Sequence, residues 1–516
     1  MKKSDFGAAW CSFLQCCCLS RLRRAIVLES FRSQIDNFLG TRSEVIESTD
    51  DGTLYSAFTP PEDVLNEDGS GNSQKLIQKF IDYGRRQTSG GAVLLKNGGG
   101  GADEALPLAS GSSVTLLGLR SHVMIHGAGQ GMPIRGPVIT LEEALGESRT
   151  DFNDPANSAS GTFTTLTDYD FEGAGFKLNP TMIENYDTLN ETCQQTLTGP
   201  WRLTSSGFYS GPYDPKEPSI ADIEAVDPDY ESSFGEYGDA AIVVIGRPGG
   251  ENRDYERGGV AEGLGAEEPL ELTTNERDII DKAAEHFEKV IVLLNCTSPM
   301  EIGELKDNDK VDSVLWVGHP GNYGTLGIAD ILCGRVSPSG SLYDIYAEKG
   351  MSHPAMVNFG DYTLANPESD YTRQASNGGN NAKYVIEAEG IYVGYRYYET
   401  RYNDIIEGRG NADSAAGAVA SSGNWNYTEE VAYGFGYGMS YSDFTQELVG
   451  RPEIEHGAHD FTMTFTVRVT NSDTGVPAAC SCTVRRRISR TAWRNPRSSC
   501  SHTIKRTCSI PAIRKR

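Results

Sequence analysis

The chain has 516 residues, and its content of 38% hydrophobic and 23% charged residues is typical of a soluble globular protein with two or three domains. It contains 71 Asp+Glu against 46 Lys+Arg, so its formal net charge is -25. That charge argues against nucleic acid and anionic membrane surfaces as partners, and it suits a neutral substrate.

Residues 1–75 are predicted to form a leader and a polar linker. An apolar run from Phe6 to Leu19 lies between Lys2 and Arg21. The run is too short and too interrupted for a transmembrane helix, and no clear small-residue cleavage site follows it. We therefore expect no membrane association and favour a cytoplasmic location, while secretion stays open.

Alternating apolar segments beyond residue 73 indicate an α/β fold. The patterns predict helices over 73–86, 274–288 and 325–332, and strands over 91–97, 113–119, 240–246, 289–295 and 311–318. Because strands that alternate with helices usually pair in parallel, we expect a mostly parallel sheet sandwiched by helices. Residues 150–238 are predicted to be an insertion with one or two helices, and residues 403–428 a surface loop.

The C-terminal part follows a different pattern. The segment 459–471, HDFTMTFTVRVTN, alternates apolar and polar residues as a half-buried antiparallel strand does, so we place a domain boundary near 447–455. From Gly475 onward the chain holds many Arg and Lys but no Asp or Glu. The cysteines there, including Cys480 and Cys482, lack the spacing of a zinc site, and we expect no metal and no cofactor.

The segment 239–262, DAAIVVIGRPGGENRDYERGGVAE, carries the strongest functional signal. Its apolar run predicts a buried parallel strand, which breaks into a glycine-rich loop with Arg247, Glu251 and Asp254. Ligands of open α/β sheets bind just beyond the carboxyl ends of such strands. A carboxylate flanked there by arginines is a candidate acid/base group, and the alternative is a solvated acidic loop.

Weaker signals come from other polar segments. The glycines of SHVMIHGAGQGM (121–132) lack the G-x-G-x-x-G spacing, so a nucleotide cradle is poorly supported. We expect structural roles rather than metal ligation for His122 and His126, and a hydrogen-bonded loop position for His319.

Five segments together resemble the α/β sandwich domain of family 3 glycoside hydrolases and keep that family's order along the chain. They are GAVLLKNGGG…EALPL (91–108), AAIVVIGRPGGENRD (240–254), GRVSPSGSLYDIYA (334–347), EGIYVGYRYYETRY (389–402) and YGFGYGMSYSDF (433–444). The resemblance implies that Glu251 is the general acid/base, with Glu256 and Glu262 as alternatives. Arg247 and Asp254 flank this loop, and as functional residues they would fix its conformation or bind substrate; we favour the alternative, an ion pair that anchors the loop.

Together with the composition and the strand patterns, the resemblance divides the chain into four parts. They are the leader and linker (1–75), the sandwich domain (76–447), the start of a fibronectin-III-like module (448–478) and an aberrant basic tail (479–516). Back-translated and read one nucleotide out of frame, the tail yields strand-like sequence, so we hypothesise a frameshift just before Ala479. For an intact relative, the cell envelope is the alternative location, and the oligomeric state stays open.

The implied reaction is retaining hydrolysis of an oligosaccharide or β-glucoside. In the family, a separate barrel supplies an aspartate nucleophile, and we find no barrel pattern in these 516 residues. We therefore expect this chain alone to be inactive or nearly so. The alternatives are a non-catalytic carbohydrate-binding or scaffold protein and, with less support, a nucleotide-binding α/β protein.

Aromatic residues near the fourth segment have two possible uses. They can stack on sugars or pack in the core, and we expect core packing. The residues concerned are Tyr392, Tyr395, Tyr397, Tyr398 and Tyr402.

Overall fold

The structure of the chain is a computed structural model. It describes residues 65, 73–98, 104–127, 138–146, 171–193, 213–249, 255, 257–360, 362–363, 383–384, 386–387, 389–414, 425–442, 444–456, 460–471 and 479–489. The longer helices are α3 (Ser73–Gly91), α6 (Pro180–Cys193), α7 (Ile220–Val226), α8 (Thr274–His286), α10 (Thr325–Leu332) and α13 (Tyr395–Glu407). The shorter ones are α4 (Leu119–His122), α5 (Leu141–Leu145), η4 (Tyr230–Ser233), α9 (Gly303–Asp307), η5 (Gly350–Ser352), α11 (Pro354–Val357) and α14 (Tyr427–Glu430).

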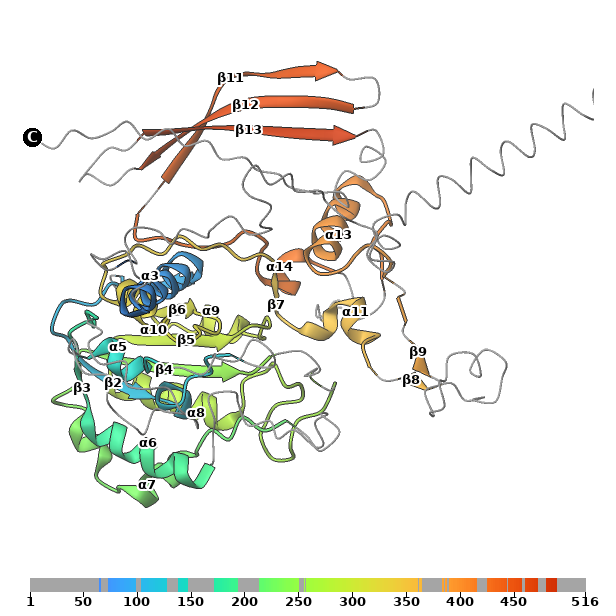
Figure 1. Cartoon of the computed structure of the whole chain (residues 1–516). Helices are drawn as coiled ribbons and strands as arrows, with labels where there is room; N and C mark the ends of the chain where they lie inside the picture. Colours follow the sequence, from blue (N-terminus) through green and yellow to red (C-terminus); the bar gives the residue numbers. More distant parts are fainter. Residues whose placement is uncertain are drawn as a thin grey trace, which may run out of the picture. The chain divides into compact units, whose positions relative to one another are not determined.

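The main sheet has six strands in the order β1-β6-β5-β4-β2-β3 (Figure 1). These strands are β1 (Val93–Asn97), β2 (Ser113–Leu117), β3 (Lys177–Leu178), β4 (Ala240–Arg247), β5 (Val290–Cys296) and β6 (Ser313–Trp316). β1 pairs antiparallel with β6, and the other neighbours pair in parallel. From β2 the chain moves outward to β3 and then returns to β4 on the other side of β2. The winding therefore reverses between β2 and β4, and open α/β sheets bind ligands beside such a reversal.

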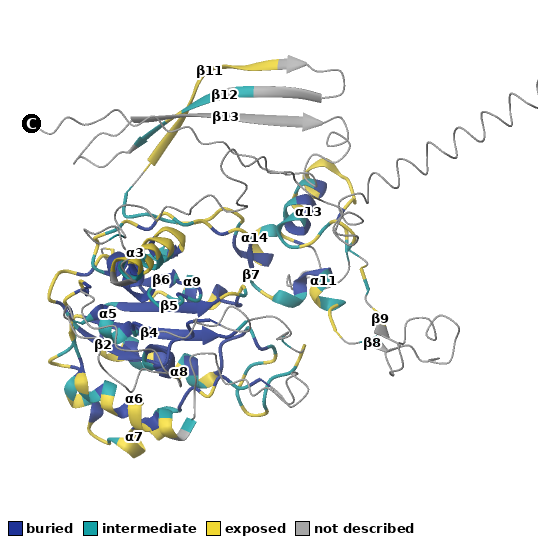
Figure 2. Ribbon diagram, in the orientation of Figure 1, coloured by how far each residue is buried: buried dark blue, intermediate teal, exposed yellow. Residues whose placement is uncertain are grey.

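Helices cover both faces of this sheet (Figure 1). On one face α6, α7 and α8 pack against Val243 and Val292, and on the other α3, α5 and α10 pack against Ile242 and Leu293. Because successive strand residues point to opposite faces, a strand covered on both faces must be apolar along its whole length. β4 and β5 are accordingly buried from end to end (Figure 2). The predicted α/β fold, with a mostly parallel sheet sandwiched by helices, is confirmed.

The predicted helices are present, but two of their ends differ. α8 ends at His286 rather than at 288, because Phe287 turns to extended backbone and its ring joins the core. α3 continues to Gly91 instead of ending at residue 86. Gly327 of α10 explains the second difference, since a Cβ there would lie only 2.3 Å from the carbonyl oxygen of Arg85. This close approach lets α10 support the last turns of α3, whose sequence favours a helix only weakly.

Two polar regions contain regular structure in addition to what their sequences predict. The described parts of the predicted insertion 150–238 hold α6, α7, η4 and the short β3. The predicted surface loop over 403–428 was wrong at its beginning, because α13 continues to Glu407. Asp404 is buried near the end of that helix, and its carboxylate accepts hydrogen bonds from Asn411 Nδ2 at 2.7 Å and the Ala412 N–H at 2.8 Å. Residues 415–424 lie outside the described residues.

Three of the sequence segments that define the resemblance meet in space. The Leu342 N–H donates to the carbonyl oxygen of Tyr437 at 2.8 Å, and the Gly436 N–H donates to that of Leu342 at 2.9 Å. Asp344 Oδ1 accepts the N–H of Tyr395, the first residue of α13, at 2.8 Å. Nearby, β7 (Tyr346–Ala347) pairs with β10 (Val431–Tyr433), and β8 (Tyr362–Thr363) pairs with β9 (Lys383–Tyr384).

A separate antiparallel sheet has the order β11-β12-β13. Its strands are β11 (Phe444–His456), β12 (Asp460–Asn471) and β13 (Ala479–Ser489). The antiparallel pairing predicted for 459–471 is confirmed, whereas the boundary predicted near 447–455 falls within β11. The fibronectin-III-like module and the frameshift before Ala479 stay predictions. Of the helices in the described ranges, none has the length and apolarity that a membrane crossing requires.

Candidate active site

Arg247 ends β4 at the carboxyl edge of the sheet, and its side chain is fully buried. Its guanidinium pairs with the Glu276 carboxylate through Nη1–Oε1 at 2.6 Å and Nη2–Oε2 at 2.8 Å. It also donates to the carbonyl oxygens of Gly246, Pro269 and Glu271 at 3.0, 2.8 and 2.6 Å. All five N–H donors of this guanidinium are therefore used within the protein.

The first turn of α8 places the carboxylate that binds Arg247. Thr273 caps this helix: its Oγ1 accepts the Glu276 N–H, and Glu276 Oε2 accepts the Thr273 N–H at 2.8 Å. Burial alone would lower the pKa of Arg247, but the charge of Glu276 raises it instead. The ion pair therefore fixes the end of β4 to the start of α8.

The loop that leaves β4 is fastened at its base by two tyrosines. The Tyr255 hydroxyl donates to the carbonyl oxygen of Pro248. Tyr213 forms a parallel β-bridge with Val260, and its N–H donates to the Gly259 carbonyl oxygen at 2.6 Å. The two tyrosine rings meet edge to face with their centroids 5.3 Å apart. The segment between Pro248 and Tyr255 thus begins and ends at one place on the carboxyl edge.

Glu217 is a buried carboxyl group beside the point where the winding reverses. Its two oxygens accept the N–H of Leu119, which follows β2, at 3.1 and 3.0 Å. Burial raises the pKa of Glu217 to about 8, and the charge of Glu276 adds to this, whereas the Leu119 N–H and Arg120 act in the opposite direction. Glu217 is therefore mostly protonated at neutral pH. Burial lowers the pKa of neighbouring Arg120 to about 10.

The histidines singled out in the sequence have polar partners in the structure. His122 Nε2 lies 2.8 Å from Asp187 Oδ1, His126 Nδ1 lies 2.7 Å from the Gly321 carbonyl oxygen, and His319 Nε2 lies 3.2 Å from that of Arg247. Burial lowers the pKa of His126 to about 4, so this imidazole is neutral at neutral pH. The hydrogen-bonded position predicted for His319 is confirmed, and the structural roles of His122 and His126 stay predictions.

Most of the predicted site residues are not described by the structure. Glu251, Asp254 and Glu256 lie outside the described residues, so their roles stay predictions, and Glu262 is exposed. For Arg247, the described contacts are those of an anchoring residue, and Glu276 is its partner in an ion pair. Direct contact between Arg247 and substrate stays a prediction that none of these contacts supports. Within the described part of the chain, no three His, Cys, Asp or Glu side chains group in a way that could hold a metal ion.

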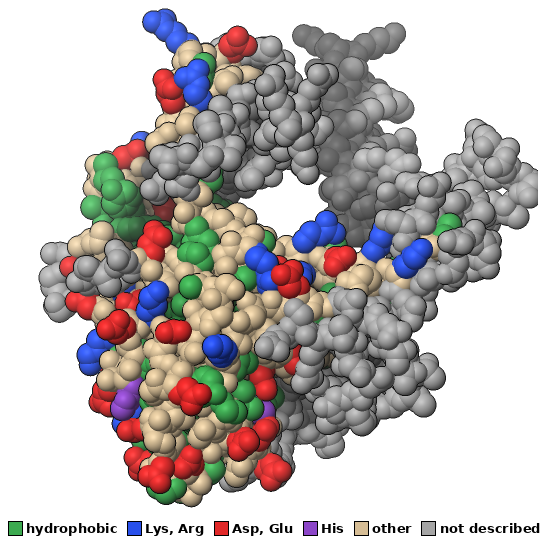
Figure 3. Space-filling model, turned by 90° about the vertical axis from the view of Figure 1, so that its left-hand side faces the viewer, with side chains coloured by type: hydrophobic (Ala, Val, Ile, Leu, Met, Phe, Trp, Pro, Cys, Tyr) green, Lys and Arg blue, Asp and Glu red, His purple; other side chains and the backbone are tan. Residues whose placement is uncertain are grey.

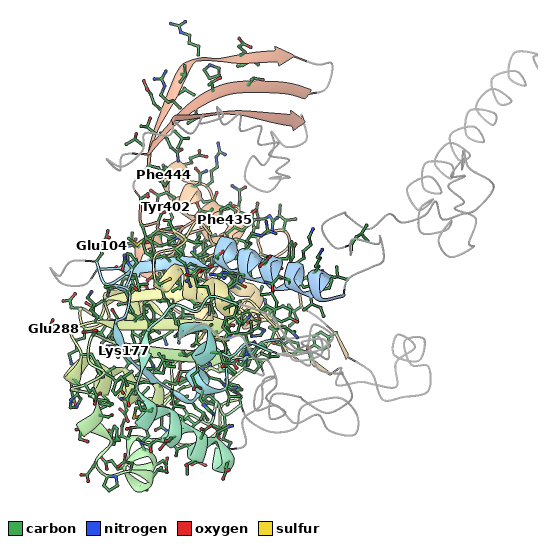
Figure 4. The ribbon with its side chains drawn as sticks, turned by 60° about the vertical axis from the view of Figure 1, so that its left-hand side comes forward. Glu104, Lys177, Glu288, Tyr402, Phe435 and Phe444 are labelled. Carbon is green, nitrogen blue, oxygen red and sulfur yellow. The ribbon has the colours of Figure 1, made fainter. Side chains whose placement is uncertain are left out.

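The tyrosines near α13 divide between core and surface. Tyr397 and Tyr398 are 1% and 2% exposed and belong to a small core cluster, as expected. Tyr392 and Tyr395 pack partly buried against that cluster. Tyr402, labelled in Figure 4, is 45% exposed, so core packing was wrong for this residue. On the face seen in Figure 3, acidic side chains gather toward the lower end, and most of the described basic side chains lie above them.

Sequence reasoning missed several residues that shape this edge. The pattern T-T-N-E at 273–276 marks the start of α8, but it says nothing of a partner 29 residues earlier in the chain. Tyr213 and Glu217 lie in a polar segment without apolar periodicity, and no signal in the sequence distinguishes them from solvated residues.

The sequence of the chain also matches known proteins. A family model described as the glycosyl hydrolase family 3 C-terminal domain matches residues 92–441. The chain is 26% identical over 393 residues to β-glucosidase A of Butyrivibrio fibrisolvens, a match that covers 73% of the chain and 37% of the relative. It is 29% identical over 235 residues to a β-glucosidase of Ruminococcus albus, covering 46% of the chain and 19% of that relative. The chain thus spans well under half the length of these curated relatives.

Solved structures share the fold. A β-glucosidase from Paenibacillus barengoltzii superposes with a TM-score of 0.52 at 22% identity, over 79% of this chain and 36% of that one. β-Glucosidase 3B from Thermotoga neapolitana, solved in complex with α-D-glucose, gives a TM-score of 0.50 at 20% identity, over 82% of this chain and 50% of that one. At such identities the likeness confirms the fold of the sandwich domain.

Proposed function

The chain belongs to glycosyl hydrolase family 3, and from this premise we propose that it is the sandwich portion of a β-glucosidase-type hydrolase in which Glu251 is the general acid/base. The reaction proposed is retaining hydrolysis of a β-glucoside or oligosaccharide. Retaining hydrolysis uses two carboxyl groups about 5–5.5 Å apart, one as nucleophile and one that first donates and then accepts a proton. Glu251 takes the second role, and the nucleophile comes from outside the sandwich domain.

The base of the loop is the observation that carries this proposal. Arg247 and the Tyr255–Pro248 hydrogen bond hold both ends of the loop at the carboxyl edge of β4. Glu251 is three residues beyond Pro248, so covalent geometry keeps the two Cα atoms within about 11 Å of each other. A carboxyl group on such a tether stays near the reversal point, where ligands of open α/β sheets bind.

The flanking residues take supporting roles in the proposal. Arg247 positions the loop through its buried contacts with Glu276 and the backbone. Asp254 either binds substrate or fixes the conformation of the loop. A rigid loop matters because an acid displaced by about 1 Å costs on the order of 100-fold in rate.

For the 516-residue chain by itself we propose little or no activity, since these residues hold no pattern of a nucleophile-bearing barrel. Purified chain incubated with an aryl β-glucoside is expected to release no phenol above background. Turnover that disappears in Glu251→Gln would contradict the proposed inactivity while supporting the role of the glutamate.

The role of Glu251 itself is tested in a chimera. Residues 92–441 replace the matching segment of the Butyrivibrio relative, which provides the remainder of its own chain. In the chimera, Glu251→Gln is expected to lower the hydrolysis of glucosides with poor leaving groups by about 10²–10⁴-fold, because general acid catalysis contributes that much. Dinitrophenolate leaves without a proton, so the rate of the first step should fall much less for dinitrophenyl glucosides. Azide should restore turnover of the glycosyl-enzyme intermediate.

Exposed Glu262 provides the matched control. In Glu262→Gln, the rates of hydrolysis of both kinds of substrate should stay within about twofold of those of the parent chimera, as expected for a solvated side chain. Equal losses for good and poor leaving groups in Glu251→Gln would exclude proton donation by this residue. A chimera that binds cello-oligosaccharides saturably but never hydrolyses them would favour the non-catalytic alternative.

A further inference from the structure

Tyr343 is an exposed aromatic residue on the carboxyl edge of the sheet. Its side chain is 64% exposed, yet its hydroxyl donates to the carbonyl oxygen of Thr297 at 3.2 Å. Thr297 is the first residue after β5. An exposed tyrosine that is tethered through its hydroxyl presents the ring in one orientation.

Trp316, the last residue of β6, supports that ring. The Trp316 indole N–H donates to the carbonyl oxygen of Cys296 at 2.8 Å, and its ring meets that of Tyr343 edge to face with centroids 6.5 Å apart. The two aromatic residues are therefore tied to consecutive carbonyl groups, those of Cys296 and Thr297, at the end of one strand. Rings held in this way lose little conformational entropy when a ligand binds.

The backbone on either side of Tyr343 is also fixed. Leu342 is buried and exchanges two backbone hydrogen bonds with the segment 436–437. Asp344 accepts the N–H groups of Ile345 and Tyr395 at 2.9 and 2.8 Å. The exposure of Tyr343 is therefore a property of a well-packed segment whose neighbouring side chains face inward.

The same edge adjoins the start of the loop that leaves β4. A Cβ added at Gly249 would lie 2.4 Å from Thr297 Oγ1, so the loop backbone passes in contact with Thr297. Thr297 therefore touches the loop through its side chain and holds Tyr343 through its carbonyl group. This shared contact brings the aromatic pair to the beginning of the Gly-Gly-Glu sequence.

We propose that Tyr343, supported by Trp316, forms an aromatic wall that stacks on the group next to the scissile bond, a neutral sugar ring or an aryl aglycone. The inference rests on the proposed function and names a substrate contact within it. An aromatic ring presents a negative face, which attracts the C–H groups on one side of a sugar ring, while the hydroxyl groups at the sugar's edge remain in water. A flat ring with only one polar atom suits a neutral ligand of this kind.

The test measures binding to the intact 516-residue chain, so that it does not depend on catalysis. Methyl β-cellobioside is titrated into protein with ¹⁵N-labelled tryptophan, and the indole resonance that Trp316→Phe removes is followed by NMR. Saturable shifts of this resonance are expected, with at least fivefold weaker binding in Tyr343→Ala. Tyr343→Phe keeps the ring but loses the hydrogen bond to Thr297, so its affinity should lie between those of the parent and Tyr343→Ala.

Tyr402→Ala is the control. Tyr402 is an exposed tyrosine too, at 45%, but its ring contacts Tyr427 and not Trp316. It should bind within twofold of the parent, and circular dichroism should show every variant folded. Unchanged binding in Tyr343→Ala, or no saturable shift of the Trp316 resonance, would refute the proposed stacking role of Tyr343. The chimera measures proton donation and this assay measures binding alone, so loss of proton donation and loss of stacking are separate results.

Discussion

Glu276→Gln is expected to destabilise the chain strongly while it leaves the shape of the side chain intact. The Glu276 and Arg247 side chains are 3% and 0% exposed, and two hydrogen bonds of 2.6 and 2.8 Å join them. Glutamine can still cap α8 through Thr273, since Gln replaces Glu in the capping box. The variant therefore removes mainly the negative charge and leaves the guanidinium buried without compensation. Breaking one partner of such a pair costs about 3–5 kcal/mol in the free energy of unfolding.

A double-mutant cycle in urea separates the ion pair from the packing. Arg247→Met alone should lower the free energy of unfolding by a similar amount. The double variant should lose less than the sum of the two single losses, with a coupling of about 0.5–3 kcal/mol. The control is Glu304→Gln, which breaks the pair with Arg277 on α8. Those side chains are 43% and 35% exposed, so the expected cost is only about 0–1 kcal/mol. A loss below about 1 kcal/mol in Glu276→Gln, or additive losses, would refute this reasoning.

Three further predictions concern other buried groups. Because burial raises the pKa of Glu217 from 4.5 to about 8, the folded chain binds more protons than the unfolded chain between these values, and stability falls as the pH rises through this window. Glu217→Gln should flatten that dependence in urea titrations at pH 5 and pH 8.5; an unchanged slope would contradict it. Gly118→Ala should cost about 1–3 kcal/mol, because φ is +83° and a Cβ would lie 2.9 Å from the Val244 carbonyl oxygen. Gly235→Ala, with no atom near the added Cβ, should match the parent in thermal unfolding; equal losses would refute the argument. Asp330→Asn should speed amide exchange in α3, since the buried carboxylate binds Arg85 at 2.5 Å; unchanged exchange would count against that role.

The sequence by itself determined the α/β fold, because the pattern that specifies it is local. A run such as AIVVIG in 241–246 must be covered on both faces, and strands that alternate with amphipathic helices pair in parallel. The position of the glycine-rich loop at the end of β4 follows from the same run. Sequence also supplied the family resemblance, which the match over residues 92–441 confirms.

Only the tertiary structure decided which side chains meet at the carboxyl edge. Arg247 pairs with Glu276, which lies 29 positions later in the sequence, because α8 packs back onto the sheet and brings its first turn to the end of β4. Tyr343 and Thr297 are 46 positions apart and meet because β5 ends beside the segment that follows α10. Such pairs depend on how elements pack after they form, and neither periodicity nor spacing along the chain records that packing.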